Sequence, residues 1–308
     1  MRAPDFWQTR GPLARLLAPL GELYGMSVAR KARAARPYRP EARVVCVGNL
    51  TAGGSGKTPV ALAVAQNLIA RQKKVFFLTR GYGGGEPGPL LVAGHDAASV
   101  GDEALLLARV APTIVARDRG EGARLADARG ADVIVMDDGH QNFSLAKDVS
   151  LLVADGFGNG LMIPAGPLRE PIAQGLARAD AVIAMNGNRD GLENFSGRLL
   201  NARLETDGAD LAGKRVFAFA GIGRPERFVA SLEAAGAIVT GHHFFADHHP
   251  YSPLEITILQ RAAKDCLLVT TEKDFVRLAP GQRAGINVLR ARILFDQPSL
   301  LDTLLAAV

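Results

Sequence analysis

Short, continuously apolar runs alternate with longer helical patterns from residue 43 onward, and this alternation is the strongest constraint on the fold. The strand-like runs are residues 43–48, 74–80, 112–117, 131–137, 149–155 and 180–186. The helical patterns between them include residues 58–71, 99–110 and 118–129. Strands that are apolar along their whole length are typical of a parallel sheet with helices on both faces. The sequence therefore predicts an α/β fold.

A second alternation of the same kind follows a polar, mixed stretch at residues 187–213. Within that stretch, the segment "GRLLNARLET" is suited to a strand that links two bodies. A chain of 308 residues is long enough for two domains, each with its own core. We therefore expect an N-terminal segment at 1–42, a larger core domain at 43–213 and a smaller α/β domain at 214–308.

The positive charge of the chain is concentrated at its N-terminus. Residues 1–43 carry nine arginines and lysines against three acidic residues, whereas the whole chain has a net charge of +5. The same segment holds an apolar series at helical spacing: Leu13, Leu16, Leu17, Leu20, Leu23 and Tyr24. This pattern predicts an amphipathic helix, kinked near Pro19 and flanked by Phe6 and Trp7.

Two interpretations of this helix stay open. A basic amphipathic helix suits an anionic membrane surface, and the uncharged stretch between Arg15 and Glu22 is too short to span a bilayer or to form a signal-peptide core. The alternative is a helix that packs on its own domain with its arginines solvated. Nucleic acid is not expected as a partner, because the basic residues lack any recognised binding fold.

The stretch "VVCVGNLTAGGSGKTPVALAV" combines a strand, a glycine-rich turn and a helix, which is the context of a phosphate-binding loop. Its letters depart from G-x-x-x-x-G-K-[ST] only at the first position, where Thr51 stands in place of glycine. Lys57 can reach the β- and γ-phosphates of a nucleotide, and Thr58 can ligate Mg²⁺. The expected nucleotide-binding residues are Thr51, Ala52, Gly53, Gly54, Ser55, Gly56, Lys57 and Thr58.

A pair of aspartates ends another apolar strand about eighty residues after the loop. Asp137 and Asp138 close the run "VIVMDD", the arrangement by which phosphate-loop proteins hold Mg²⁺ from a neighbouring strand end. Such a pair is otherwise often a turn or a helix cap. The preceding phosphate loop favours the metal role.

Three further clusters carry ionisable groups. Asp102 and Glu103 begin a helical pattern, where a carboxylate can also serve only to complement the helix dipole. The segment "GHHFFADHHPYS" holds four of the six histidines, for which an acid–base or orienting role is favoured over metal binding. Arg169 and Glu170 in "IPAGPLREP" suit either a charge clamp on a phosphate or a surface pair.

Several of these segments, taken together and in order, resemble the tetraacyldisaccharide 4′-kinase family. The matching segments are "FWQTRGPLARLLAPLGELYG", "VGNLTAGGSGKTP", "LTRGYGG", "GDEALLLAR", "ARDR", "DDGHQ", "PAGPLREP", "GIGRPERF", "FADHHPYS" and "TEKDFVRL". The loop of this family also opens with a hydroxyl residue, so Thr51 agrees with the resemblance. The resemblance implies two α/β domains that close over ATP, and transfer of its γ-phosphate to the 4′-hydroxyl of a lipid-linked disaccharide at the cytoplasmic face of the inner membrane.

The resemblance also implies residue roles. Lys57 and the loop amides hold the phosphates, and Thr58 with Asp137 or Asp138 handles Mg²⁺. Asp102 is the base that takes the 4′-hydroxyl proton, and His248 orients it, although His249 is equally at hand in the sequence. Arg169 and Glu170 match active-site positions whose roles sequence does not divide. Proton transfer and charge neutralisation are what phosphoryl transfer requires.

Two other functions are compatible with the same motifs. A nucleotide-switched, membrane-associated binding protein would use the loop and Mg²⁺ for domain closure alone, but it has no need for Asp102 beside a histidine cluster. A kinase of a soluble sugar or nucleoside has no need for the basic amphipathic N-terminus. The expected partners are therefore a lipid-linked disaccharide and an anionic inner-membrane surface, with no obligate protein partner evident.

Overall fold

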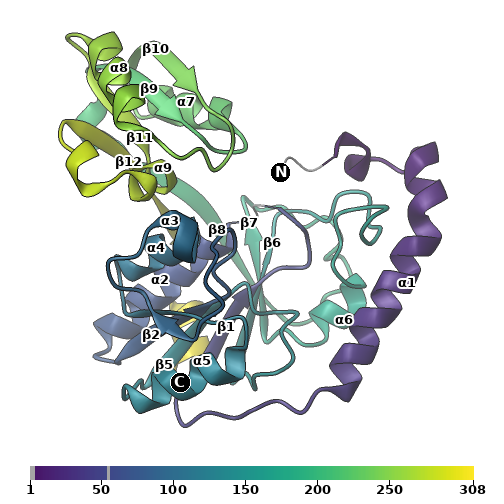
Figure 1. Ribbon diagram of the computed structural model, residues 1–308. Helices are drawn as coiled ribbons and strands as arrows, with labels where there is room; N and C mark the ends of the chain where they lie inside the picture. Colours follow the sequence, from purple (N-terminus) through teal and green to yellow (C-terminus); the bar gives the residue numbers. More distant parts are fainter. Residues whose placement is uncertain (1–3, 54–55) are drawn as a thin grey trace.

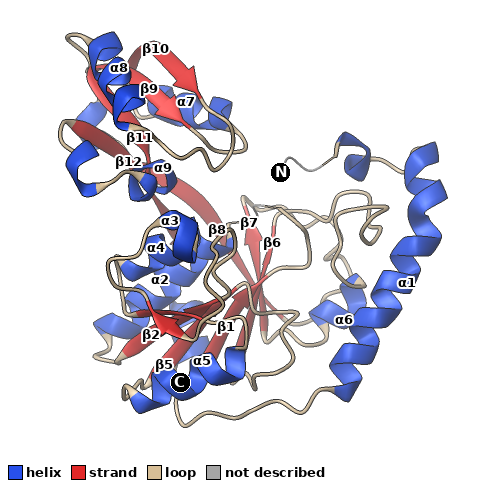
Figure 2. Ribbon diagram, in the orientation of Figure 1, coloured by secondary structure: helices blue, strands red, loops and turns tan. Residues whose placement is uncertain are grey.

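The computed structural model describes residues 4–53 and 56–308. Among these residues, twelve strands form one sheet in the order β10-β9-β11-β12-β8-β7-β6-β1-β5-β2-β4-β3. Neighbouring strands run parallel except for two pairs, β8 with β12 and β3 with β4. The predicted α/β class with a mainly parallel sheet is confirmed. Figures 1 and 2 show that this sheet passes from a larger lobe into a smaller one.

The larger lobe, which we call the core lobe, contains the first seven strands. These are β1 (Arg43–Gly48), β2 (Val75–Thr79), β3 (Leu90–Leu91), β4 (Thr113–Val115), β5 (Val133–Asp137), β6 (Val149–Ala154) and β7 (Ala181–Met185). Its helices are α2 (Lys57–Ala70), α3 (Ala97–Val100), α4 (Asp102–Ala108), α5 (Arg119–Ala128) and α6 (Ile172–Leu176). All residues of β2, β5, β6 and β7 are buried, as the continuous apolar runs predict.

Helices cover both faces of the core sheet. On one face, Val45 and Val47 of β1 pack with Val60 and Val64 of α2. On the other face, the alternate residues of β1 pack with α5, and the neighbouring strands pack towards α6. This alternation follows from the two-residue period of a strand.

The smaller lobe, which we call the C-terminal lobe, follows the linking strand β8 (Arg198–Asp207). It comprises β9 (Arg215–Ala220), α7 (Pro225–Ala234), β10 (Ile238–Phe244), α8 (Pro253–Ala263), β11 (Leu267–Thr271) and α9 (Glu272–Arg277). Strand β12 (Ile286–Phe295) belongs to both lobes, because Ile286–Leu289 pair with β11 and Arg290–Phe295 pair with β8. Single-turn 3-10 helices lie at Asp5–Gln8, Ala209–Leu211 and Pro280–Gln282.

The end of the chain returns to the core lobe, which differs from the predicted smaller domain at 214–308. Helix α10 (Pro298–Leu305) buries Leu301, Leu304 and Leu305 in the same cluster as α2. Asp302 of α10 also pairs with Arg71 at the end of α2. The apolar face of α10 therefore completes the core lobe. The division at 1–42, 43–213 and 214–308 stays a prediction, and we propose that the smaller domain ends near Leu289.

Helix α1 (Pro12–Ala34) lies along the side of the core lobe near α6, and Pro19 is inside it without ending it. Its buried residues are small: Ala14, Gly21 and Gly25. A Cβ atom at Gly21 would meet the carbonyl oxygen of Met162 at 2.7 Å, so glycine is what lets this helix approach so closely. No helix in the described ranges 4–53 and 56–308 is long and apolar enough to cross a membrane.

The exposed leucines of α1 lie on the side of the helix opposite Ala14, Gly21 and Gly25. Leu16 is 75% exposed, and the other exposed large apolar side chains of the helix are Leu13, Leu20, Leu23 and Met26. The indole nitrogen of Trp7, one of the two aromatic residues predicted to flank the helix, donates to the carbonyl of Pro164 at 3.0 Å. The helix is therefore docked on the protein by glycine and alanine, and most of its leucines are exposed.

Candidate active site at the phosphate loop and the interlobe contact

The phosphate loop begins where β1 ends and runs into the N-terminus of α2. Gly56 caps α2 with a φ of 80°, a left-handed conformation that favours glycine. Gly53 also has a positive φ, of 117°. Gly54 and Ser55, both predicted to bind nucleotide, lie outside the described residues. The strand–loop–helix arrangement that the sequence predicts is present, so the amide groups at the start of α2 face the loop.

The first half of the loop is held by the protein itself. The side-chain amide of Asn49 donates to the carbonyl of Thr51 at 2.8 Å and to its hydroxyl at 3.1 Å. The backbone N–H of Ala52 donates to the carbonyl of Pro167 at 2.8 Å, so this amide is engaged within the protein. Thr51 in place of glycine is therefore compatible with the loop, because its hydroxyl has a fixed hydrogen-bond donor.

Thr58 and Asp137 meet beneath the loop. The Thr58 hydroxyl donates to Oδ2 of Asp137 at 3.1 Å, and Oδ1 of Asp137 is buried without a hydrogen-bond partner among the described residues. Burial, followed by the neighbouring Asp138, raises the pKa of Asp137 to about 6. The protein itself therefore does not supply enough positive charge to neutralise this buried carboxylate.

Asp138 takes the basic residues of the site instead. Lys57 Nζ lies 3.6 Å from Oδ1 of Asp138, and Arg169 Nη1 donates to both of its oxygens at 2.8 and 3.0 Å. Burial tends to raise the pKa of Asp138, but the charges of Lys57 and Arg169 hold it below the usual value. The structure thus gives the two aspartates different environments, which the sequence left undivided.

Arg169 and Glu170 point to different surroundings. Arg169 reaches the phosphate-loop site, whereas Glu170 is 1% exposed and pairs with Arg178. Glu170 also accepts from the amide of Gln141 at 2.8 Å, and the same amide donates to the carbonyl of Asn49 at 2.8 Å. Glu170 therefore supports the strand end that leads into the loop.

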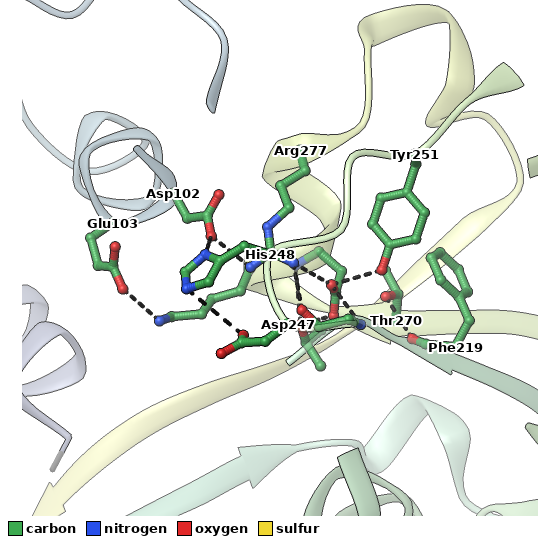
Figure 3. A network of polar contacts seen from close by, with 12 residues as sticks. Asp102, Glu103, Phe219, Asp247, His248, Tyr251, Thr270 and Arg277 are labelled. Carbon is green, nitrogen blue, oxygen red and sulfur yellow. Dashed lines mark hydrogen bonds and ion pairs between the residues drawn. The ribbon is translucent and has the colours of Figure 1, made fainter. Parts of the chain in front are cut away.

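Asp102 and His248 meet across the two lobes (Figure 3). Asp102 is the first residue of α4, and its Oδ2 atom lies 2.7 Å from Nδ1 of His248. His248 has a left-handed φ of 61°, which turns its side chain from the loop after β10 towards α4. His249 instead bonds Glu255 at 3.0 Å and stacks on Phe245. Of the two histidines that the sequence left open, His248 is the one beside Asp102.

The start of α4 connects this pair to the phosphate loop. Glu103, the residue after Asp102, contributes to the electrostatic field at Lys57 and at Asp137, although burial is the largest influence on the pKa of both groups. Glu103 also forms an ion pair with Lys273 of α9, at 2.6 Å. Two groups of predicted site residues therefore lie at one end of the core sheet: the loop with its aspartates, and the interlobe pair.

Sequence reasoning missed four side chains that hold this site together. They are Asn49, Gln141, Lys273 and Arg277. Each lies inside a segment that carries the family resemblance, "VGNLT", "DDGHQ" or "TEKDFVRL", and that placement was the available signal. Within residues 4–53 and 56–308, no group of three or more His, Cys, Asp or Glu side chains could hold a metal ion.

A phosphate loop that feeds a helix, with aspartates at the neighbouring strand end and a carboxylate–histidine pair nearby, defines the class of P-loop phosphotransferases. The family model described as tetraacyldisaccharide-1-P 4′-kinase matches residues 13–308. The chain belongs to this family and is a kinase.

Relatives and a solved structure agree with this assignment. The tetraacyldisaccharide 4′-kinase of Paramagnetospirillum magneticum is 54% identical, over 99% of this chain and 98% of the relative. The protein of the same name from Rhodospirillum rubrum is 51% identical, over 99% and 97%. A crystal structure described as the "apo" form of LpxK from Aquifex aeolicus in complex with ATP has a TM-score of 0.81 and 25% identity, covering 96% of this chain and 98% of that chain.

Proposed function

We propose that this kinase transfers the γ-phosphate of ATP to the 4′-hydroxyl of a tetraacyldisaccharide 1-phosphate, a step of lipid A biosynthesis. The relatives' name supports the acceptor, and the ATP of the similar crystal structure supports the donor. The observation that carries the proposal is the Asp102–His248 pair at the end of the sheet that also holds the phosphate loop. A nucleotide switch without phosphoryl transfer has no use for such a pair.

The residues around the loop suit a nucleotide with Mg²⁺. Mg²⁺ is usually held by one or two carboxylates together with phosphates and water, so two protein ligands suffice. Asp137, with its unpartnered buried oxygen, and the Thr58 hydroxyl are the groups that would hold it. Asp138 is neutralised by Lys57 and Arg169, so its role would be to orient these two cations. When bound, Mg²⁺ supplies charge neutralisation on the transferring phosphate.

Lys57 and Arg169 supply the protein's own positive charge. Lys57 is 11% exposed and Arg169 is 24% exposed, so both charges act in a partly desolvated site where electrostatic effects are stronger than in water. In the proposed reaction, Lys57 with the amides at the start of α2 holds the β- and γ-phosphates. Arg169 stabilises charge on the transferring phosphoryl group, and Glu170 keeps the strand end and loop in place through Gln141.

Asp102 is the proposed base. His248 and Arg277 both bond its Oδ2 atom, while Oδ1 accepts no hydrogen bond from any residue in the described ranges. Oδ1 is therefore the oxygen that takes the proton of the 4′-hydroxyl. As that O–H bond breaks, the hydroxyl oxygen forms a bond to the γ-phosphorus, and the bond from the γ-phosphorus to the bridging oxygen breaks to release ADP. His248 orients the carboxylate during this step.

The exposed leucine face of α1 supports a peripheral position on the cytoplasmic face of the inner membrane. Five large apolar side chains of this helix are exposed, and Arg15, Arg30, Lys31 and Arg33 on the same helix are exposed as well. An amphipathic helix with these two features binds a surface that is both apolar and anionic. The acceptor, which carries acyl chains, would then be met at that surface.

A transfer assay tests the proposal. The intact protein is incubated with ATP labelled at the γ-phosphate, Mg²⁺ and vesicles that contain a tetraacyldisaccharide 1-phosphate. The proposal predicts label in the lipid fraction, in a product whose new phosphate is on the 4′-oxygen by phosphorus NMR. Label released only as inorganic phosphate, or transferred equally well to a soluble sugar, would contradict it.

A further inference from the structure

Arg277, the arginine of "TEKDFVRL", bonds the proposed base, and its guanidinium lies between the two lobes. Arg277 is the last residue of α9, and its side chain is 3% exposed. Nη2 donates to Oδ2 of Asp102 in the core lobe at 2.6 Å. Nη1 donates to Asp274 at 2.8 Å and to the carbonyl of Gly221 at 2.7 Å, both in the C-terminal lobe. One buried side chain therefore connects the proposed base to the other lobe (Figure 3).

Asp274 fixes Arg277 from behind. Its fully buried carboxylate also accepts from the backbone N–H of Gly221 at 2.9 Å, the hydroxyl of Tyr251 at 2.8 Å and the hydroxyl of Thr271 at 2.7 Å. With Arg277, four groups donate to this one carboxylate, which holds it in place, although Nε of Arg277 has no partner among the described residues. The position of the Arg277 guanidinium is therefore set by the sheet and loops of the C-terminal lobe.

The same network supports the loop that carries His248. The carbonyl of Gly221, which accepts from Arg277, also accepts from the backbone N–H of His248 at 3.1 Å. Arg277 is thus bonded to both sides of the interlobe pair: directly to the carboxylate of Asp102, and through Gly221 to the backbone of its histidine partner.

Arg277 also favours the ionised form of Asp102. Burial raises the pKa of this carboxyl, but the hydrogen bond and charge of Arg277, followed by those of His248, hold the pKa below its usual value. The other charged groups around Asp102 are the Glu103–Lys273 pair between α4 and α9, Asp247 at 3.8 Å from the far nitrogen of His248, and Asp274 behind Arg277. Burial is the largest single influence on this pKa, and Arg277 is the largest of the influences that oppose it.

We propose that Arg277 is a positioning residue for the phosphoryl transfer: it holds the Asp102 carboxylate ionised, with Oδ1 free for the acceptor hydroxyl, only while the C-terminal lobe is docked on α4. The inference rests on the proposed function, in which Asp102 is the base. It adds the residue that makes that base dependent on contact between the lobes.

The test is the pH dependence of kcat in two Arg277 variants. Arg277→Met removes the charge and the bonds, and Arg277→Lys keeps the charge but cannot make the three-way contact. For Arg277→Met we expect kcat near neutral pH to fall roughly 100-fold, as for a misplaced reacting group, with ATP affinity within about twofold of the unchanged protein. The acidic limb of its kcat profile should move to higher pH, because an unpaired buried carboxylate holds its proton more tightly. Arg277→Lys should recover part of both losses.

A matched control removes the neighbouring interlobe ion pair without touching Asp102. The double variant Lys273→Met with Glu103→Gln loses the second ion pair that joins α4 and α9 in the described residues and leaves the net charge unchanged. Its acidic limb should not move. An equal movement in this control, or a fall of kcat by one constant factor at every pH in the Arg277 variants, would show that Arg277 acts only by holding the lobes together and would overturn the proposal.

Two further measurements keep the result decisive. Histidine ordinarily titrates near neutral pH, so the profiles are repeated in a His248→Gln background, where the effect of Arg277 must persist. Melting temperature and ATP affinity show whether each variant is folded. If Arg277→Met does not fold, the test rests on Arg277→Lys: an unchanged kcat and an acidic limb at the same pH in that variant would contradict the inference. Absence of label transfer by the unchanged protein would sink the proposed function itself, whereas transfer unaffected by Arg277 changes would sink only this inference.

Discussion

The Nδ1 atom of His248 lies 2.7 Å from Oδ2 of Asp102, although 146 positions separate the two residues in the chain. Asp102 begins a helix of the core lobe, and His248 follows the edge strand of the C-terminal lobe. The pair exists only when the two lobes are in contact. Any chemistry that depends on it is therefore coupled to the relative position of the lobes.

The two adjacent histidines give a direct test of this pairing. His248→Ala should lower kcat strongly, because the proposed base loses the group that orients it, by roughly 10²-fold. His249→Ala is the control, since His249 bonds Glu255 and stacks on Phe245 within its own lobe. The His249→Ala variant should lower the melting temperature, and it should lower kcat less than His248→Ala does. A larger kcat loss in the His249 variant would reverse the assignment.

In the proposed function Lys57 binds the phosphates of ATP, so its removal should affect turnover and not the fold. Its side chain is 11% exposed and lies 3.6 Å from Asp138, and burial lowers the pKa of the lysine. We expect Lys57→Ala to lose ATP-dependent activity by about 10²-fold or more with a cooperative melting transition retained. Near-normal turnover of the variant at saturating ATP would overturn the nucleotide assignment. Circular dichroism of the variant and the unchanged protein provides the control for folding.

The ionised side chain of Asp137 should lower the free energy of unfolding when the protein is free of nucleotide and metal. Burial, then Asp138, raises its folded-state pKa to about 6, whereas an unfolded aspartate titrates near 3.9. The stabilising effect of its proton is present below about pH 4 and is lost as pH rises through about 6. Asp137→Asn should therefore raise the unfolding free energy at pH 7.5 by on the order of 2–3 kcal/mol, with little change at pH 4.

The same variant should be inactive, because a neutral amide is a poor replacement for a carboxylate that would hold Mg²⁺. Denaturant titrations at the two pH values, in the presence of a chelator, measure the stability. Equal destabilisation at both pH values would mean that Asp137 is a structural acceptor for Thr58 and not a strained, charged group.

The leucine face of α1 should bind vesicles that contain anionic lipid. Replacing Leu16, Leu20 and Leu23 by serine should abolish flotation with such vesicles and raise the apparent KM for a bilayer-embedded acceptor, while a detergent-solubilised acceptor is affected less. The melting temperature should be unchanged, because these side chains are exposed. The matched control is the double change Leu254→Ser and Ile258→Ser on α8, which removes exposed apolar groups on the other lobe. Equal flotation of all three proteins would contradict the membrane role.

Sequence reasoning located the strands well because buried parallel strands carry an unmistakable apolar pattern. Strand β1 was predicted at residues 43–48 and observed at Arg43–Gly48, and β8 was predicted as the linking strand. Helices α6 and α9 were missed because five or six residues are too short to show a helical period. Helix α10 was not predicted, and periodicity shows only that a face is apolar, not which lobe buries it.

Motifs that carry their own chemistry allow site residues to be predicted from sequence, as at Lys57 and Thr58, whose roles stay predictions. A role that depends on three-dimensional contact is not predicted in this way. His248 and His249 are indistinguishable in sequence, and the left-handed φ of His248 separates them. Arg277 looks like a surface residue of a charged segment, yet it is buried by a contact with the opposite lobe.

The measurement that tests the central claim most directly is a comparison of kcat and ATP affinity in Asp102→Asn. Asparagine keeps the shape of the side chain and a hydrogen-bond acceptor for Arg277, but it cannot take a proton. If Asp102 is the base, label transfer to the lipid acceptor at saturating ATP should fall by roughly 10²–10⁴-fold while the Kd for ATP changes by no more than about twofold. A collapse of ATP affinity with kcat preserved would show that Asp102 binds nucleotide and that the base lies elsewhere.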